Sequence, residues 1–271
     1  MLNRSRLILI IIAVSMMTGC ALTNAETPSR IALLAPFEGR YREVGYDAFY
    51  AAKLAIIEAD RSNIELLAVD DGGMVENAAS RARALTLDPL VKVVIVIGYD
   101  AADINVQTAF SDLPVIIVGN WMTEPQSDNV FILSNPDIEL SYDGRLDVTE
   151  VALLDTPFIC GEVCALNGYR RLLDTFDGTT IISSGSLADD DFKQRIIDNF
   201  QFSAEPGLLA TLTYDAVNMA IEAADSENVS QTLSEMTYDG ITRTISFEDG
   251  YWLDGPVNVY VFDDDGELVR E

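Results

Sequence analysis

The sequence contains no histidine among its 271 residues. Histidine is the only side chain whose unperturbed pKa lies near neutrality, so its absence excludes Ser-His and Cys-His catalysis, histidine general bases and imidazole metal sites. Basic residues are also scarce: 17 Lys and Arg stand against 44 Asp and Glu, which gives a formal net charge of −27. Because such a charge repels phosphate backbones, we expect no binding to nucleic acid.

Apolar residues, by contrast, are plentiful and make up 49% of the chain. The composition is therefore not that of an acidic disordered chain, and the length predicts one large domain or two small lobes. We interpret the acidic excess as a solvated surface, which favours solubility and a monomer and would attract cationic partners.

The N-terminus has the layout of a secretory signal peptide. Arg4 and Arg6 precede an apolar run over residues 7–14, which is shorter than the roughly 20 residues that a membrane-spanning helix needs. The run is followed by Met17-Thr18-Gly19-Cys20, which resembles a bacterial lipobox in which methionine replaces the preferred leucine.

This resemblance implies that residues 1–19 are removed and that Cys20 carries the lipid. A diacylated cysteine supplies enough buried CH₂ groups for stable anchoring, so we expect attachment to a bacterial membrane on its extracytoplasmic side. Residues 20–29 have no hydrophobic periodicity and are predicted to form a short tether. The alternative is a plain secreted protein in which the cysteine stands at this position by chance.

Two further cysteines, Cys160 and Cys164, are separated by a segment that contains a glycine. Exported proteins meet oxidising conditions, and Gly161 favours a turn, so we predict a small local disulfide rather than a free pair. Two cysteines cannot complete a zinc site in a chain without histidine, and we expect no metal and no cofactor.

The first half of the mature chain alternates apolar runs with helical patterns. We predict strands at 31–35, 64–69, 91–97, 115–119 and 130–133, and helices at 46–59, 74–87 and about 101–110. Short continuous apolar runs indicate strands buried on both faces, and the alternation predicts right-handed crossovers within a parallel sheet covered by helices on both faces. Further along, the patterns favour strands at 148–154, 179–182, 241–247 and 257–262, helices at 166–176, 192–200 and 208–224, and a turn at 263–266.

Three stretches resemble the type 1 periplasmic binding proteins, and most closely the branch that binds leucine, isoleucine and valine for ABC transporters. The first is the run 31–41 followed by Gly45. The second is Asp70-Asp71-Gly72 followed by residues 78–98. The third is Pro206 with Tyr214-Asp215-Ala216 and the tail 245–250.

The resemblance implies an α/β protein of two lobes that close like a hinge around a ligand at the carboxyl ends of the strands. Lobe 1 would combine residues 30–138 with about 206–245, and lobe 2 would combine about 139–205 with 246–271. The chain has far fewer residues between Pro136 and Ser184 than this family uses. We therefore expect a reduced second lobe.

The resemblance also implies which loops contact a ligand, namely those after the first, third and fourth strands. Asp100 stands where a small hydroxyl residue is usual, and its carboxylate would repel an α-carboxylate and suit a cation or a polyol. An alternative role for Asp100 is to cap the following helix. The candidate ligand-binding residues are Arg40, Tyr41, Tyr99, Asp100, Ala101, Asn120 and Trp121.

Several of these residues allow more than one interpretation. Arg40 could clamp a carboxylate with two parallel hydrogen bonds or be a solvated loop arginine. Trp121 could stack on a ligand or cover the hinge between the lobes. Asn120 can both donate and accept hydrogen bonds.

The leading functional hypothesis is a lipid-anchored solute-binding protein that takes a small polar, amino acid-like molecule and works with the permease subunits of an ABC transporter. The alternative is a partner-binding lipoprotein on the same scaffold. Activators of peptidoglycan synthases resemble this sequence over residues 36–45, although they usually add a helical-repeat domain that this sequence lacks. An enzyme is disfavoured, because histidine and a G-x-S-x-G nucleophile motif are both absent.

Lipid anchoring has a direct test. In the Cys20→Ala variant we expect release of the protein from the membrane fraction, because the acyl chains that hold it there can no longer be attached. Fractionation of cells and immunoblotting measure this, and a variant that stays with the membrane would contradict the lipobox interpretation.

Overall fold

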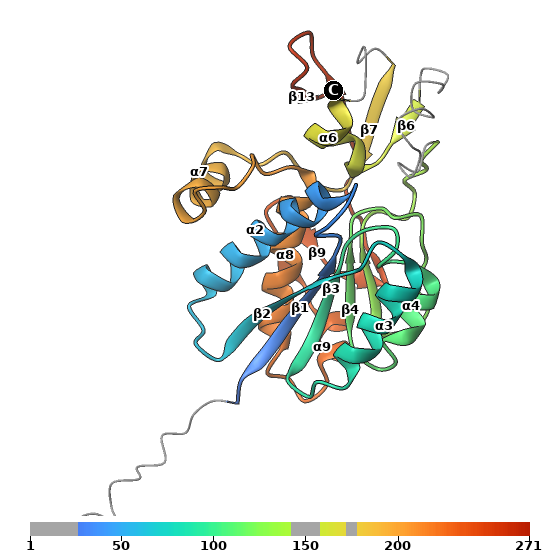
Figure 1. Cartoon of the computed structure of the whole chain (residues 1–271), viewed down its shortest axis with the longest axis vertical. Coiled ribbons are helices and arrows are strands. Elements are labelled where there is room, and N and C mark those ends of the chain that lie inside the picture. Colours follow the sequence, from blue (N-terminus) through green and yellow to red (C-terminus); the bar gives the residue numbers. More distant parts are fainter. Residues whose placement is uncertain (1–26, 142–157, 172–177) are drawn as a thin grey trace, which may run out of the picture.

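A computed structural model of the chain describes residues 27–141, 158–171 and 178–271. Its larger sheet has the strand order β10-β11-β5-β4-β3-β1-β2 and is parallel except for the β10–β11 pair at one edge (Figure 1). The central strands are largely apolar and buried, as the sequence predicts, and their polar residues are Ser29, Arg30 and Lys92. The strands are β1 (Ser29–Ala35), β2 (Ile64–Asp70), β3 (Val91–Val96), β4 (Val115–Val118), β5 (Val130–Leu133), β10 (Phe247–Glu248) and β11 (Tyr251–Trp252).

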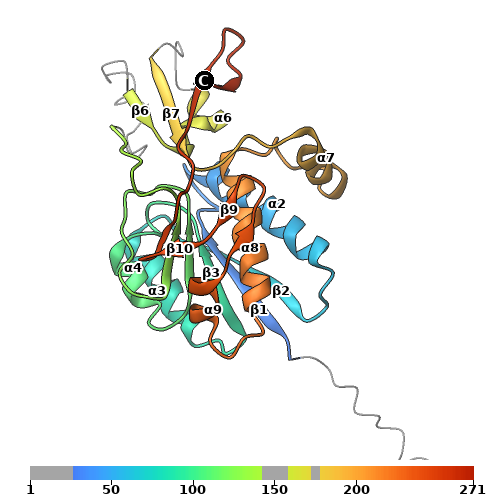
Figure 2. The same ribbon diagram turned by 180° about the vertical axis from the view of Figure 1, so that it is seen from behind.

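Helices cover both faces of this sheet, as expected. On one face α2 (Arg42–Ala59) packs along α8 (Leu208–Ala223), and on the other α3 (Val75–Thr86) packs along α4 (Ile104–Ala109) (Figure 1). Seen from behind, α9 (Val229–Glu235) follows α8, and the chain returns past β9 (Thr244–Ile245) and β10 (Figure 2). Helix α8 is buried along almost its whole length, so it forms part of the core of the first lobe.

A smaller sheet of order β13-β12-β7-β6 lies beyond the carboxyl ends of the larger sheet (Figure 1). Its own core contains Phe158, Tyr169, Ile181 and Tyr260. It is the second lobe, and it is smaller than the first. Its elements are β6 (Phe158–Cys160), η1 (Glu162–Ala165), α6 (Asn167–Arg170), β7 (Thr179–Ser183), β12 (Asn258–Phe262) and β13 (Leu268–Arg270).

Two segments that were expected in the second lobe pack against the first lobe instead. Helix α7 (Asp190–Asn199) falls within 139–205, yet its residues Phe192 and Ile196 pack against Ala51 and Leu54 of α2 in the first lobe. Strands β10 and β11 fall within 246–271, yet they extend the larger sheet. Packing decides both positions. Helix α7 buries its apolar side chains against α2, and β11 pairs with the edge strand β5.

Several local predictions are confirmed and others are wrong. Residues 263–266 turn between β12 and β13, as predicted. Helix α7 starts two residues before the predicted 192, and its cap is Asp189, whose side chain accepts a hydrogen bond from the Phe192 amide at 2.8 Å. Asp103, not Asp100, caps α4: its side chain accepts from the Asn105 amide at 2.8 Å, and the helix starts three residues later than expected. Instead of one strand at 241–247, two short ones form, β9 (Thr244–Ile245), which pairs with β8 (Tyr238–Asp239), and β10.

The predicted strand at 148–154 lies outside the described residues, as does the second part of the predicted helix at 166–176. Within residues 27–141, 158–171 and 178–271, no helix has both the length and the apolar character needed to cross a bilayer.

Gly45 of α2 lies where the helix touches the loop that follows β1. A Cβ atom at this position would collide with the carbonyl oxygen of Pro36. Alanine has the higher helix propensity, but this collision involves backbone on both sides and cannot relax. We expect Gly45→Ala to lower the free energy of unfolding by about 2 kcal/mol, measured by urea denaturation.

Gly39→Ala is the matched control, because Gly39 has a positive φ of 73° but no atom near the position of a Cβ. This variant meets backbone strain alone and should lose about 1 kcal/mol or less. An equal loss in the two variants would contradict the close contact between α2 and the loop after β1.

Candidate functional site

The loops at the carboxyl ends of the parallel strands meet at the edge of the larger sheet that faces the second lobe. Asp70, the last residue of β2, connects two of these loops. Its carboxylate accepts hydrogen bonds from the amide of Phe37 at 2.8 Å and from the amide of Gly72 at 3.0 Å. The loop after β1, which holds Arg40 and Tyr41, is thereby fixed to the loop after β2.

This edge carries negative charge. Asp71 is 2% exposed and accepts a hydrogen bond from the Gly73 amide at 2.8 Å. Burial, together with smaller contributions from the charges of Asp100 and Asp70, raises the pKa of Asp71 to about 6. Asp100 is half-buried at the end of β3, and Arg40 is exposed in the loop after β1. In the part of the chain that the structure describes, no three acidic or cysteine side chains gather closely enough to hold a metal ion.

Three aromatic side chains form a row beneath this edge. The ring of Tyr99 lies edge-on to Tyr41, with centroids 6.0 Å apart, and edge-on to Trp121, with centroids 4.8 Å apart. Trp121 is 3% exposed, and its indole N–H donates to the Val118 carbonyl at 2.6 Å. The structure therefore places Trp121 in the core of the first lobe, where it also lines a pocket beside the loop after β4, and its contact with a ligand stays a prediction.

Asn120 is half-buried, and it joins the loop after β4 to the connection that leaves β5. Its side-chain amide donates to the Ile138 carbonyl at 3.2 Å, and its side-chain oxygen accepts from the Met122 amide at 3.0 Å. Of the other candidates, Ala101 is fully buried and Tyr99 is 6% exposed. The residues that reach the surface of this edge are therefore Arg40, Tyr41, Asp100 and Asn120, and their contact with a ligand stays a prediction.

Glu162 is a residue of this edge that sequence analysis missed. It belongs to η1 of the second lobe, is 2% exposed, and accepts hydrogen bonds from the Ser183 hydroxyl at 2.7 Å and the Asn120 amide at 3.3 Å. Burial raises the pKa of Glu162 above its ordinary value. The only signal in the sequence was its position between Cys160 and Cys164, which pointed to a disulfide and not to a buried acid.

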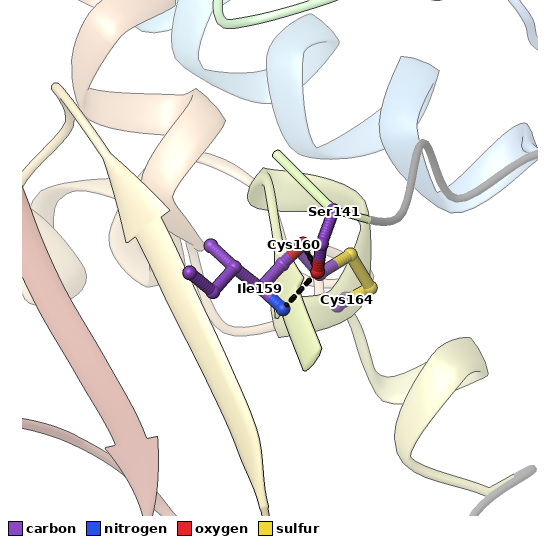
Figure 3. Close-up of a disulfide and its surroundings, with 4 residues drawn as sticks. All are labelled: Ser141, Ile159, Cys160 and Cys164. Atoms are coloured by element: carbon purple, nitrogen blue, oxygen red, sulfur yellow. Dashed lines mark hydrogen bonds between the residues drawn. A yellow bond between two sulfur atoms is a disulfide. The ribbon is translucent and has the colours of Figure 1, made fainter. Parts of the chain in front are cut away.

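Those two cysteines form a disulfide in the structure, with Cα atoms 6.1 Å apart (Figure 3). Both cysteines are fully buried. Ser141 lies alongside: its amide donates to the Ile159 carbonyl at 2.9 Å, and its hydroxyl accepts from the Ile159 amide at 2.7 Å (Figure 3). The segment that carries Glu162 is therefore fixed on both sides.

The two lobes also touch through α2. The Glu43 carboxylate accepts a hydrogen bond from the Gly168 amide of α6 at 2.6 Å, which connects the first lobe to the second. One turn later, Asp47 accepts from the amides of Gly207 at 2.7 Å and Ala210 at 3.1 Å and so caps α8 from a neighbouring helix.

A pocket of about 220 Å³ opens at the carboxyl ends of β4, β5 and β11. Its lining includes Asn120, Ser134, Asn135 and Tyr251, so polar groups predominate around it. It is the cavity that lies directly beside the predicted ligand-binding loop after β4.

No known family profile and no curated protein matches the sequence. Solved structures do match. A possible leucine/isoleucine/valine-binding protein from Rhodopirellula baltica SH 1 superposes with a TM-score of 0.73, at 11% identity over 93% of this chain and 98% of the other. The isoleucine complex of the branched-chain amino acid transporter substrate-binding protein LivJ from Streptococcus pneumoniae superposes with a TM-score of 0.64, at 15% identity over 90% of this chain and 100% of the other. The chain has the type 1 periplasmic-binding-protein fold.

The leucine-binding protein LivK from Thermotoga maritima shares this fold, with a TM-score of 0.67 at 14% identity over 90% of this chain and 97% of the other. The expected architecture, a mostly parallel sheet flanked by helices with a second lobe beyond its carboxyl edge, is confirmed.

The buried carboxyls predict a dependence of stability on pH. Burial raises the pKa of Asp71 to about 6 and that of Asp215, which accepts hydrogen bonds from the Ile241 amide, to about 7. A carboxyl whose pKa is higher in the folded than in the unfolded chain contributes its full stability below the unfolded pKa and loses it as pH rises through the folded pKa. We expect the free energy of unfolding to increase by about 1 kcal/mol per group as pH falls from about 8 to 5.

Chemical denaturation at a series of pH values measures this change. In Asp215→Asn the free energy of unfolding should depend less steeply on pH, because an asparagine keeps the shape of the side chain and does not titrate. Asp112→Asn makes the same change in charge at an exposed position and should leave the slope in place. A wild-type slope in Asp215→Asn would show that this buried carboxyl does not titrate in the range.

Proposed function

We propose that the protein is an extracytoplasmic solute-binding protein, held to a bacterial membrane by a lipid on Cys20, that takes a small polar ligand between its two lobes. The observation that carries the proposal is the fold, in which a parallel sheet presents its carboxyl edge to a second lobe. Open α/β sheets bind their ligands at this edge, and two lobes joined by several chain segments can close by a hinge motion. The proteins of known structure that share the fold include ABC transporter substrate-binding proteins.

The charge at the edge narrows the class of ligand. Asp70 and Asp71 stand at the end of β2, and Asp100 follows β3. A free carboxylate placed beside these groups would be repelled, and it would have Arg40 as its favourable partner on the loop after β1. We therefore propose an amino acid-like or related ligand that directs an ammonium or hydroxyl group toward Asp100, delivered to, or sensed for, an ABC transporter.

A second candidate function is supported by contacts that the protein makes with itself. The Glu162 carboxylate reaches from the second lobe to the Asn120 amide, and Glu43 reaches from the first lobe to the Gly168 amide. Lobes that are bonded to each other in this way form a continuous surface. This observation favours a lipoprotein that binds a protein partner, such as an enzyme of cell-wall synthesis, on the scaffold of a binding protein.

Screening by thermal shift separates the two functions. The full chain in detergent is heated with amino acids, polyamines, sugars, polyols and nucleosides. A ligand present at 100 times its Kd should raise the free energy of unfolding by about 2.7 kcal/mol. A single class of stabilising ligand is the expected result, and the absence of a shift with every class would favour the partner-binding function.

The Asp100→Asn variant tests the role of the charge. For an amine-bearing ligand we expect the Kd to rise about tenfold, because loss of a charge-assisted hydrogen bond removes roughly 1.4 kcal/mol. Asp112→Asn is the control for net charge, and isothermal titration calorimetry measures both. Equal Kd values for the two variants would place the ligand away from the end of β3.

A further inference from the structure

Glu162 occupies the space directly above the end of β4. The last residue before the loop, Gly119, has a φ of 89°, and a Cβ built on it would lie 3.4 Å from the Glu162 carboxylate. The carboxylate therefore packs against the backbone of the first lobe, although it belongs to η1 of the second lobe. Nearly all of the residue is hidden from solvent, with 2% of its surface exposed.

Burial of a carboxylate is unfavourable unless donors surround it. The donors here are the Ser183 hydroxyl and the backbone amide of Glu162 itself in its own lobe, and the backbone amide of Asn120 in the other lobe. Among the residues that the structure describes, no Lys or Arg forms an ion pair with Glu162. The bond to Asn120 is therefore one of the few means by which the molecule compensates this charge, and separation of the lobes would break it.

The segment around Glu162 is built to hold the side chain in this place. The disulfide joins the residues two positions before and two positions after it, and both cysteines are fully buried. Ser141 fixes the preceding strand by its hydrogen bonds to Ile159 (Figure 3). A side chain constrained on both sides loses little conformational entropy when it binds, so its contact with Asn120 is preorganised.

The carboxyl end of a strand in an open parallel sheet is the place where such folds receive ligands. At the end of β4, the backbone N–H of Asn120 donates a hydrogen bond to the Glu162 carboxylate. We propose that Glu162 acts as a built-in ligand of the cleft, whose carboxylate holds the second lobe against the end of β4 when no solute is bound. This goes beyond solute binding, because closure of the lobes then needs no solute, and an incoming ligand competes with Glu162 for the Asn120 amide.

Hydrogen exchange at single amides tests the proposal, read by mass spectrometry with electron-transfer fragmentation on the full chain in detergent. In Glu162→Ala the Asn120 amide loses its acceptor, and we expect its exchange rate to rise about tenfold or more. The Met122 amide, whose acceptor is the side chain of Asn120 within the same loop, should exchange as in the wild type. An unchanged rate at Asn120 would overturn the proposal.

Glu43→Ala is the matched control, because it removes another hydrogen bond between the lobes, the one to the Gly168 amide. We expect faster exchange at Gly168 and no change at Asn120. If Glu43→Ala exposes Asn120 as much as Glu162→Ala does, the lobes are held by their general contact and Glu162 has no special role.

Glu162→Gln keeps the size of the side chain and serves if the alanine variant does not fold. Its neutral oxygen is a weaker acceptor, so we expect a smaller but measurable rise at Asn120 with no change at Ile95 in the middle of β3. A parallel rise at Ile95 would mean global destabilisation and would count against the proposal. Replacement of both Cys160 and Cys164 by serine should likewise speed exchange at Asn120, and an unchanged rate would show that the disulfide does not position Glu162.

Discussion

Asn135 ties together the chain segments on which the arrangement of the two lobes depends. The chain passes between the sheets after β5, after β7 and before β12, and Asn135 lies in the first of these passages. Its amide donates to the Ser184 hydroxyl at 2.8 Å, and its side chain donates to the Gly255 carbonyl. Asn135 therefore joins all three chain segments that connect the two lobes. Any motion of one lobe relative to the other must bend the chain around this point, as in other hinged proteins.

The distribution of charge explains much about the edge that faces the second lobe. Two of the few basic residues form ion pairs away from this edge: Arg30 with Asp88 at the amino end of β1, and Arg195 of α7 with Glu58 at the far end of α2. Buried acids at the carboxyl edge are left to backbone amides and hydroxyl groups. Asp71 and Glu162 are thus stabilised by dipoles, and burial raises the pKa values of both carboxyls.

The sequence was sufficient to predict the larger sheet, because a strand buried on both faces is apolar along nearly its whole length. Residues 115–118 are apolar at every position, and the run 91–97 has Lys92 as its one polar residue. It was not sufficient where tertiary contacts decide. Asp100 and Asp103 are equally good caps by composition, and only the path of the loop after β3 selects Asp103.

The local sequence also gave no indication that Trp121 is buried or that Glu162 contacts the first lobe. Whether Trp121 or Glu162 is buried depends on how segments far apart in the sequence pack against each other. Nothing in the residues next to Glu162 in the sequence indicates that its side chain is buried. The same reason accounts for α7 and β11, whose partners α2 and β5 lie far away in the sequence.

The position of α8 has a consequence for the order in which the molecule can form. Strands β1 to β5 are complete once residue 133 has been synthesised, but α8, which packs beside α2 on one face of their sheet, begins only at residue 208. Asp47 of α2 likewise waits for the amides of Gly207 and Ala210. The nascent N-terminal lobe thus keeps an uncovered apolar face until most of the chain has been made. The first lobe therefore cannot be completed before residues 208–223 have been synthesised.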